Sequence, residues 1–305
     1  MNGGIKISKL TALLAFVLIL TLISGIGAAA EISVQPGSSI QSAINNSTSG
    51  DVITVSPGTY TENIKITKDN LTIRSESGNP DDTIIQAGTP NANVLLLKAD
   101  NITISGFKIL GATDPIHSGI YLSSCRNCTI DNNKLLNNGL GIYTLYSSGN
   151  IISNNTVTNN EEYGIAIQSS KDNLLSGNTA SDSSRGIHFG NSDGNTFSDN
   201  TVQNNSVYGF YICPRSDRNL IYNNYFNNTN MTIKNGEGNS YNITKTSGTN
   251  IVGGSYIAGN FWGKPDGTGF SQTAVDKDGD GIADSAYKNI THSTYSDYLP
   301  LVEHK

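Results

Sequence analysis

The sequence predicts an all-β fold, a right-handed single-stranded parallel β-helix with about 22–24 residues in each coil and a short N-terminal capping helix. Three periodic features indicate this solenoid: a glycine followed by an apolar residue, asparagines at two fixed positions, and apolar residues two positions apart. A β-sandwich also has many short strands, but it does not keep equivalent residues at one spacing over consecutive turns.

The glycine–apolar pair recurs at intervals of 22, 23, 22 and 23 residues. Its copies are Gly119-Ile120, Gly141-Ile142, Gly164-Ile165, Gly186-Ile187 and Gly209-Phe210. In most copies a second apolar residue follows two positions later, as in Ile120 and Leu122. Side chains two residues apart point the same way in a strand, so these pairs predict short strands that face the core.

Asparagines mark the corners between the predicted strands. One column contains Asn150, Asn173, Asn195 and Asn219, and a second, five residues later, contains Asn155, Asn178, Asn200 and Asn224. Cys128 and Asn133 extend the two columns by one turn toward the N-terminus. Parallel coils stack about 4.8 Å apart, so like residues lie above one another. We therefore interpret these asparagines as side-chain amide ladders, which need no catalytic explanation.

The first thirty residues are predicted to be a secretory signal peptide. Lys6 and Lys9 precede an almost wholly apolar stretch over 10–26, and small residues at 28–30 offer a cleavage site. The alternative is an uncleaved anchor, since the apolar stretch approaches the length of a membrane span. Cleavage would leave a secreted or cell-surface protein with no membrane span, or a periplasmic one if the host has an outer membrane.

The rest of the chain divides into three regions. Residues 31–100 are expected to form the N-terminal cap and the first irregular coils, with a short helix near Ile40 to Ile44. Residues 101–260 hold the regular repeats, and residues 261–305 are expected to form a C-terminal cap. Open ends of a solenoid expose unpaired backbone and core, so both ends need such caps.

Charge and cysteine content exclude some functions. Without Lys6 and Lys9 the chain has 17 basic and 25 acidic residues, a net charge of 17 − 25 = −8. An acidic chain without clusters of lysine or arginine is not expected to bind nucleic acid. Its three cysteines cannot all pair within one chain, so packing and hydrogen bonds must supply the stability.

One loop has the spacing of a calcium site. Asp276, Asp278, Asp280 and Asp284 occupy loop positions 1, 3, 5 and 9, with glycine at position 6 and the Ile282 carbonyl at position 7. Position 12 is Tyr287 rather than the bidentate glutamate of an EF-hand, so another ligand or water must complete the site. We expect weak binding of calcium with a structural role in the cap; the alternative is a solvated acidic loop.

A column of outward-facing residues follows the repeat glycines by two positions. It contains Tyr121, Tyr143, Ala166, His188 and Tyr211. Aromatic faces on a flat sheet can stack against sugar rings or against aromatic groups of a partner. They also pack against one another across neighbouring strands. The sequence leaves both interpretations open, with Tyr121, Tyr143, His188 and Tyr211 as the candidate carbohydrate-binding residues.

The repeats resemble the parallel β-helix domain of the NosD family, named after a periplasmic copper-protein maturation factor, with relatives among surface carbohydrate-binding and sugar-hydrolysing proteins. The stretch from Ile40 to Tyr60 is similar to the N-terminal cap of pectate-lyase-like proteins. Gly259 to Trp262, Asp276 to Asp284 and Tyr298 to Leu301 resemble the endings of exported archaeal and bacterial relatives. This resemblance implies the fold and export, and says little about activity.

A copper-handling function, as the NosD name suggests, is one alternative to the binding of carbohydrate or a cell-envelope partner. Copper favours Met, Cys and His ligands, yet Met231 is the one methionine outside the predicted signal peptide. The histidines show no ligand spacing; they are His117, His188, His292 and His304. Cys125 and Cys128 are the one candidate pair, and we interpret them as a corner thiol and a ladder residue, or as a local disulfide.

Polysaccharide lyase or glycoside hydrolase activity is the first alternative to a binding function. A glycoside hydrolase needs paired carboxylates, and a lyase needs a base beside a stabilising charge. Acids of the regular coils scatter among corners, although Glu161 and Asp182 could approach across adjacent turns near Arg185. We predict no catalytic residue, because exposed corner positions account for these acids.

The favoured hypothesis is a non-catalytic, exported β-helix protein. Its partner would be a polysaccharide, a surface glycan or a cell-envelope protein. Several Asn-x-Ser/Thr sequons could carry glycans, but asparagine is so abundant that chance matches are expected. They include Asn70, Asn204, Asn227, Asn242 and Asn289.

Overall fold

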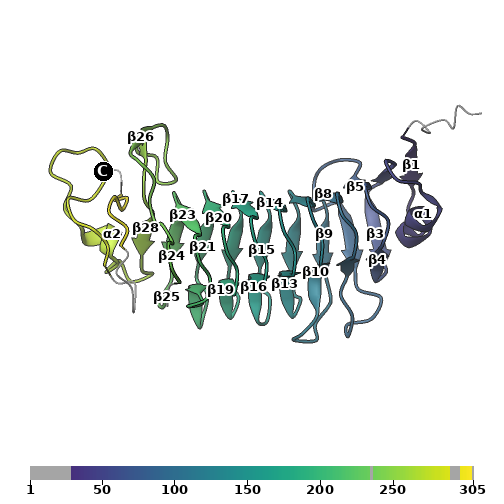
Figure 1. Cartoon of the computed structure of the whole chain (residues 1–305). Helices are drawn as coiled ribbons and strands as arrows, with labels where there is room; N and C mark the ends of the chain where they lie inside the picture. Colours follow the sequence, from purple (N-terminus) through teal and green to yellow (C-terminus); the bar gives the residue numbers. More distant parts are fainter. Residues whose placement is uncertain (1–28, 234–235, 289–295, 304–305) are drawn as a thin grey trace, which may run out of the picture.

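A computed structural model describes residues 29–233, 236–288 and 296–303. The chain winds as a parallel β-helix along one long axis, with helix α1 (Ile40–Asn46) at one end and helix α2 (Phe270–Thr273) at the other (Figure 1). The predicted fold class is therefore confirmed. Residues 1–28 of the predicted signal peptide, Asn289, His292 and His304 lie outside the described residues.

Three parallel sheets form the walls of the solenoid, and the chain passes from sheet A to sheet B to sheet C in each coil. Sheet A contains β1 (Glu31–Val34), β2 (Val52–Val55), β5 (Thr72–Ser75), β8 (Thr103–Ser105), β11 (Thr129–Asp131), β14 (Ile151–Ser153), β17 (Leu174–Ser176), β20 (Thr196–Ser198) and β23 (Leu220–Tyr222). Sheet B contains β3 (Gly58–Thr61), β6 (Thr83–Gln86), β9 (Lys108–Leu110), β12 (Lys134–Leu136), β15 (Thr156–Thr158), β18 (Thr179–Ser181), β21 (Thr201–Gln203), β24 (Tyr225–Asn227) and β28 (Phe261–Gly263). Sheet C contains β4 (Ile64–Ile66), β7 (Leu95–Leu97), β10 (Ser118–Ser123), β13 (Leu140–Leu145), β16 (Tyr163–Gln168), β19 (Arg185–Gly190), β22 (Tyr208–Ile212) and β25 (Thr232–Ile233).

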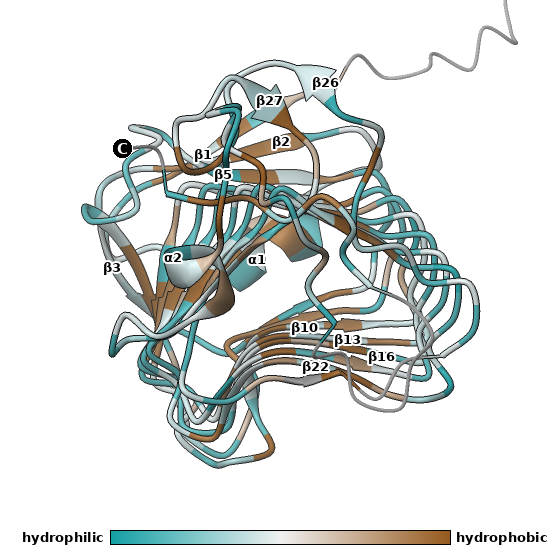
Figure 2. Ribbon diagram, turned by 90° about the vertical axis from the view of Figure 1, so that its left-hand side faces the viewer, coloured by the Kyte–Doolittle hydropathy of each residue, from teal (hydrophilic) through white to brown (hydrophobic). Residues whose placement is uncertain are grey.

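Apolar side chains from all three sheets are buried along the axis. In the ribbon, hydrophobic segments recur at like positions in successive coils (Figure 2). Ile120 and Leu122 are both fully buried, while Tyr121 between them faces outward and is partly exposed. Ile120 pairs with Ile142 on the next strand, so like residues stack along the axis as the repeat predicted. Toward the C-terminal end the core becomes aromatic, with the Phe197 and Phe210 rings stacked at 5.6 Å.

Buried carboxamides form the predicted ladders. The Oδ1 atom of Asn155 accepts hydrogen bonds from the backbone and side chain of Asn133 at 3.0 and 3.1 Å. Its Nδ2 donates to the Ile130 carbonyl at 2.8 Å and to Asn178 Oδ1 at 3.0 Å. One carboxamide thus joins the preceding coil to the following one and satisfies the corner backbone.

Two further ladders were not predicted. The first lies at the corner between sheets B and C and contains Asn138, Asn160, Ser183, Asn205 and Asn228. The second follows sheet C and contains Cys125, Ser147, Ser170, Ser192 and Ser216. Serine carries only a hydroxyl, yet its oxygen accepts the same backbone N–H, so the column continues where the side chain shortens.

The predicted helix caps the N-terminal end. Helix α1 (Ile40–Asn46) begins after Ser39, whose side chain accepts a hydrogen bond from the Ser42 N–H at 3.1 Å. Ile40 and Ile44 on its inner face are buried and close the first coils. Glu62 also accepts hydrogen bonds from the first turn, from the N–H groups of Ile40 and Gln41.

The regular repeat ends earlier than residue 260. The next ladder residue after Asn224 is Asn260, 36 residues later, because an insertion holds the antiparallel pair β26 (Thr246–Ser247) and β27 (Tyr256–Ile257). Strand β28 then rejoins sheet B against β24, and helix α2 (Phe270–Thr273) packs beside it. Asp297 completes the asparagine column by accepting a hydrogen bond from the Asn260 N–H at 2.7 Å.

Candidate functional site

The outer face of sheet C carries the predicted aromatic column, but as two separate pairs. The Tyr121 and Tyr143 rings lie 5.3 Å apart and are tilted, whereas His188 and Tyr211 are stacked at 4.8 Å. Ala166, which is buried, lies between the two pairs. The column therefore packs on itself across neighbouring strands while its four aromatic members remain partly exposed.

A second column, missed in the sequence, lies beside the first and is aromatic at two of its five positions. It consists of the residues just before the repeat glycines, which are Ser118, Leu140, Tyr163, Arg185 and Tyr208. The Arg185 guanidinium carbon lies 5.2 Å from the centroid of the Tyr163 ring and 5.8 Å from that of Tyr208. Arg185 also forms an ion pair with Glu162. In the sequence, the signal for this cluster is limited to Tyr163 and Tyr208, each of which stands just before a repeat glycine.

His188 joins the two columns. Its Nδ1 lies 3.1 Å from the Tyr208 hydroxyl, and its ring meets that of Tyr163 edge-on at 5.2 Å. Burial, and then the nearby positive charge of Arg185, lower the pKa of His188 to about 4. Burial likewise raises the pKa of the Tyr208 hydroxyl. At neutral pH His188 and Tyr208 are therefore uncharged, and the Arg185–Glu162 pair supplies the charges of this cluster.

A polar groove follows the corner between sheets B and C, next to the second column. It has a volume of about 590 Å³. Its lining contains Thr113, Asn137, Asn138, Asn159, Asn160, Glu161, Asp182, Ser183, Ser184, Asn204 and Ser206. The structure thus brings Glu161 and Asp182 into one groove, as their positions in adjacent coils suggested. Arg185 is not part of the lining, because its guanidinium turns to Glu162 and the tyrosines.

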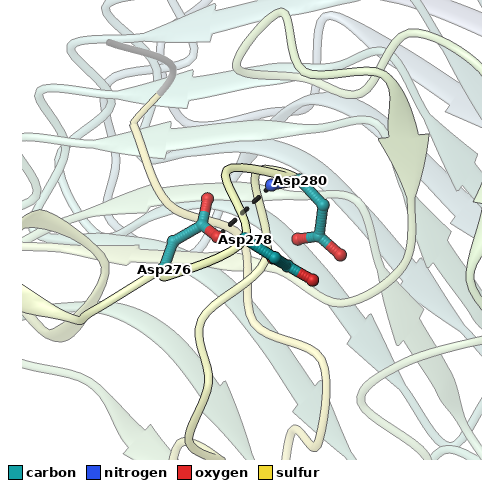
Figure 3. Close-up of side chains that lie close together, drawn as sticks. All are labelled: Asp276, Asp278 and Asp280. Carbon is teal, nitrogen blue, oxygen red and sulfur yellow. Dashed lines mark hydrogen bonds between the residues drawn. The ribbon is translucent and has the colours of Figure 1, made fainter.

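Three of the four predicted calcium carboxylates lie together in the C-terminal cap (Figure 3). Each of Asp276, Asp278 and Asp280 offers one oxygen, and these oxygens lie within 4.8 Å of one another. Asp276 accepts hydrogen bonds from the N–H groups of Gly279 and Gly281 at 2.8 and 2.9 Å. Burial raises the pKa of Asp276, but these hydrogen bonds outweigh it and hold the pKa below its usual value.

The remaining loop positions lie around this group. The Asp284 carboxylate is outside it and lies 3.8 Å from Lys277 Nζ. Ile282 donates its N–H to Asp280 at 2.8 Å and buries its side chain in the cap. Tyr287, at loop position 12, stacks on Trp262 at 4.5 Å and closes the core instead of facing the carboxylates. Lys245 forms an ion pair with Asp280.

Oxygen ligands from three carboxylates fit a hard cation such as calcium. A cation at this position would also relieve the repulsion among the three charges, which Lys245 now offsets for Asp280. Tyr287 contributes no ligand on this face, so further oxygens would come from backbone carbonyls, Asp284 or water.

Cys125 and Cys128 are buried, free thiols at the heads of two ladders. The Cys125 N–H donates to Ser147 Oγ at 3.0 Å and the Cys128 N–H to Asn150 Oδ1 at 2.9 Å. A hydrogen bond between the thiols lowers the pKa of Cys125 and raises that of Cys128. The sequence left two interpretations open. In the structure Cys125 is a corner thiol and Cys128 is a ladder residue, and the two do not form a disulfide.

Residues 44–267 match the family model described as "Periplasmic copper-binding protein (NosD)". The chain is 37% identical over 131 residues to a cell surface glycoprotein of Methanothermus fervidus, which covers 41% of this chain and 21% of that protein. None of the helices among the described residues is long and apolar enough to cross a membrane.

Two solved structures share the fold at low sequence identity. The pectate lyase Pel9A is 14% identical with a TM-score of 0.57, and the match covers 67% of this chain and 64% of the Pel9A chain. ORF18 of Geobacillus virus E2 is 17% identical with a TM-score of 0.50, and the match covers 65% of this chain and 53% of the ORF18 chain. This chain therefore spans about a fifth of the glycoprotein and less than two thirds of either structure. At these identities the two structures support the fold alone.

Proposed function

This chain belongs to the NosD family, and we propose that it is an exported, cell-surface β-helix protein that binds carbohydrate on sheet C without catalysing a reaction. The relative from M. fervidus, a cell surface glycoprotein, supports the location. A cell-envelope protein that presents aromatic groups to the same face is the alternative partner.

One observation carries the proposal: aromatic rings from two adjacent columns gather on the outer face of sheet C. Tyr163, His188, Tyr208 and Tyr211 contact one another around Arg185, with ring centroids 4.8 to 5.4 Å apart for the pairs in contact. Partly exposed rings held in place by their neighbours offer apolar faces to a sugar at little entropic cost.

Replacing Tyr121, Tyr143 and Tyr211 together with alanine tests this binding. We expect the triple variant to lose retention on a glycan array, because each substitution removes a stacking face. Tyr146→Ala is the matched control, since Tyr146 is 67% exposed at a corner outside the column. Circular dichroism must show an intact β-helix in both. Unchanged retention in the triple variant would assign the column to packing alone.

Polysaccharide lyase or hydrolase activity is the second candidate, because Glu161 and Asp182 line one groove. Assays for new reducing ends and for unsaturated products, run on the glycans that bind, separate it from binding. We expect neither product. Product formation that Glu161→Gln abolishes would make the protein an enzyme.

We also propose a structural calcium ion at Asp276, Asp278 and Asp280. Calcium should raise the midpoint of thermal unfolding, since an ion that binds only the folded state stabilises it. Asp278→Asn should remove most of this rise, whereas Asp172→Asn, at an exposed corner far along the chain, should keep it. A midpoint that calcium leaves unchanged in the unmodified protein would exclude the site.

A further inference from the structure

We infer that the groove between sheets B and C binds glycans without acidic groups, and favours those that carry amino sugars. This inference rests on the proposed carbohydrate binding and specifies the chemical class of glycan. The groove runs along successive coils, so it presents the same kinds of polar group at intervals of about 4.8 Å. A polymer that repeats its own hydroxyl groups can follow such a row.

The floor of the groove is rigid. Asn138, Asn160 and Ser183 belong to the corner ladder and are buried. The Asn160 amide donates to the carbonyls of Leu135 and Thr158 at 3.3 and 3.2 Å. Their hydrogen-bonding groups are thus engaged within the protein and hold the corner in one conformation.

One wall is a row of exposed side chains on left-handed backbone. Asn137, Asn159, Asp182 and Asn204 have φ values of 54°, 53°, 54° and 57°. Asparagine and aspartate tolerate this conformation well, which explains their recurrence at this corner. Backbone hydrogen bonds fix each position, as from the Asn137 N–H to the Asn159 carbonyl at 3.1 Å.

Two of the four side chains of this wall, and Glu161 beside it, are available to a ligand, whereas Asn159 and Asp182 each contact Thr158 Oγ1. Among the described residues, the side chains of Asn137, Asn204 and Glu161 make no hydrogen bond within the protein. Each carboxamide offers both a donor and an acceptor, and each carboxylate offers two acceptors. Sugar hydroxyls need both kinds of partner, so the fixed backbone and free tips suit their recognition.

The charges in the groove decide the class of glycan. Glu161 and Asp182 contribute two carboxylates, and no lysine or arginine is among the lining residues. The neighbouring cation, Arg185, is already paired with Glu162. Polyuronates would therefore bring carboxylates against carboxylates without a compensating cation, whereas an ammonium group of an amino sugar would be attracted.

The groove also borders the aromatic face. Tyr163 follows Glu161 by two residues, and Tyr208 follows Ser206 by two residues. A sugar ring on Tyr163 or Tyr208 would thus lie beside the polar wall of the groove. Stacking and hydrogen bonding from adjacent elements are the two contacts that carbohydrate sites combine.

Isothermal titration with three oligosaccharides tests the inference: a chitosan oligomer, a neutral glucan oligomer and a galacturonate oligomer. We expect the chitosan oligomer to bind most tightly, the glucan more weakly, and the galacturonate not at all. Glu161→Gln combined with Asp182→Asn should weaken chitosan binding at least tenfold and leave glucan binding within twofold. Asp172→Asn, an exposed aspartate at another corner, should change neither.

The outcomes separate the groove from the proposed function. If none of the three sugars binds and the glycan array is empty, carbohydrate binding itself fails. If sugars bind through the tyrosines but the groove variant behaves like the unmodified protein, only the groove inference fails. Preferred binding of galacturonate would also overturn it, because the charge argument excludes that ligand.

Discussion

A single asparagine carboxamide in this protein forms hydrogen bonds with both the preceding coil and the following coil. Asn178 Oδ1 accepts hydrogen bonds from the backbone and side chain of Asn155, both at 3.0 Å. Its Nδ2 donates to the Ile152 carbonyl at 2.7 Å and to Asn200 Oδ1 at 2.9 Å. All of these groups are buried, so in the folded protein each depends on the ladder rather than on solvent for its partner.

Asn178→Ala is therefore expected to be strongly destabilising. Each orphaned buried group costs about 1–3 kcal/mol, so the total should be about 3 kcal/mol or more. Chemical denaturation measures it. Asn159→Gly is the control, because an exposed residue with φ of 53° can become glycine at a cost of about 0.5 kcal/mol or less. Equal losses in both variants would contradict a special role for the ladder.

Asp297 makes the stability of the cap depend on pH. Burial raises its pKa to about 7, although the Asn260 N–H and the Trp262 indole donate to it at 2.7 and 2.8 Å. A carboxyl whose folded pKa lies above its unfolded value stabilises the fold at low pH. This contribution is lost as pH rises from about 4 through 7.

The difference in stability between the unmodified protein and Asp297→Asn isolates this effect. Relative to the variant, the unmodified protein should lose about 4 kcal/mol between pH 4 and pH 8, from a shift of roughly three pKa units. Thermal unfolding at a series of pH values measures the change. A difference independent of pH would mean that Asp297 does not titrate in this range.

At the scale of the element, the C-terminal segment acts as one more rung. The Leu301 N–H donates to the Asn260 carbonyl and the Gly259 N–H to the Leu299 carbonyl, both at 2.9 Å. The Leu301 side chain is fully buried against Phe261 and its neighbours. The segment therefore covers backbone and core that an open last coil would expose.

Ending the chain after residue 295 should lower the unfolding midpoint and cause self-association, since an uncovered strand edge pairs with other chains. Light scattering coupled to size exclusion measures the association. A chain that ends after Val302 serves as the control, because it keeps this rung. A monomer with an unchanged midpoint would show that the rung is dispensable.

Features that recur unchanged in successive coils could be predicted from the sequence, whereas substituted positions and contacts between distant segments could not. Two ladders were visible because Asn150 and Asn155 recur without substitution in later coils. The corner ladder was hidden because serine replaces asparagine at Ser183, and because Asn137 and Asn138 are adjacent but face different surroundings. The spacing of Asp276, Asp278 and Asp280 predicted that these three carboxylates lie together. The stacking of Tyr287 on Trp262 could not be predicted in this way, because it joins segments that are distant in the sequence.

At the scale of the whole molecule, stability should vary along the axis. Solenoid coils contact only their neighbours, so each region is as stable as its own rungs. Coils between Cys128 and Asn228 carry buried ladders at several corners, whereas the pair β26 and β27 is joined over two residues in each strand, and Thr246 and Ser247 are exposed.

Hydrogen exchange followed by mass spectrometry should show this gradient. We expect the slowest exchange in peptides from residues 128–228 and exchange at least tenfold faster around residues 244–257. Uniform protection along the chain would instead mean that the solenoid opens as one cooperative unit.

The ladders also bear on how such a protein can change length. Within an asparagine ladder, each carboxamide accepts hydrogen bonds from the coil before it through Oδ1 and donates one to the coil after it through Nδ2, so an inserted asparagine coil finds matching partners on both sides. Duplication or loss of one 22- or 23-residue unit would keep such ladder contacts in register and leave both caps unchanged. The length of the solenoid can thus be altered during evolution by whole coils, without a new fold at each step.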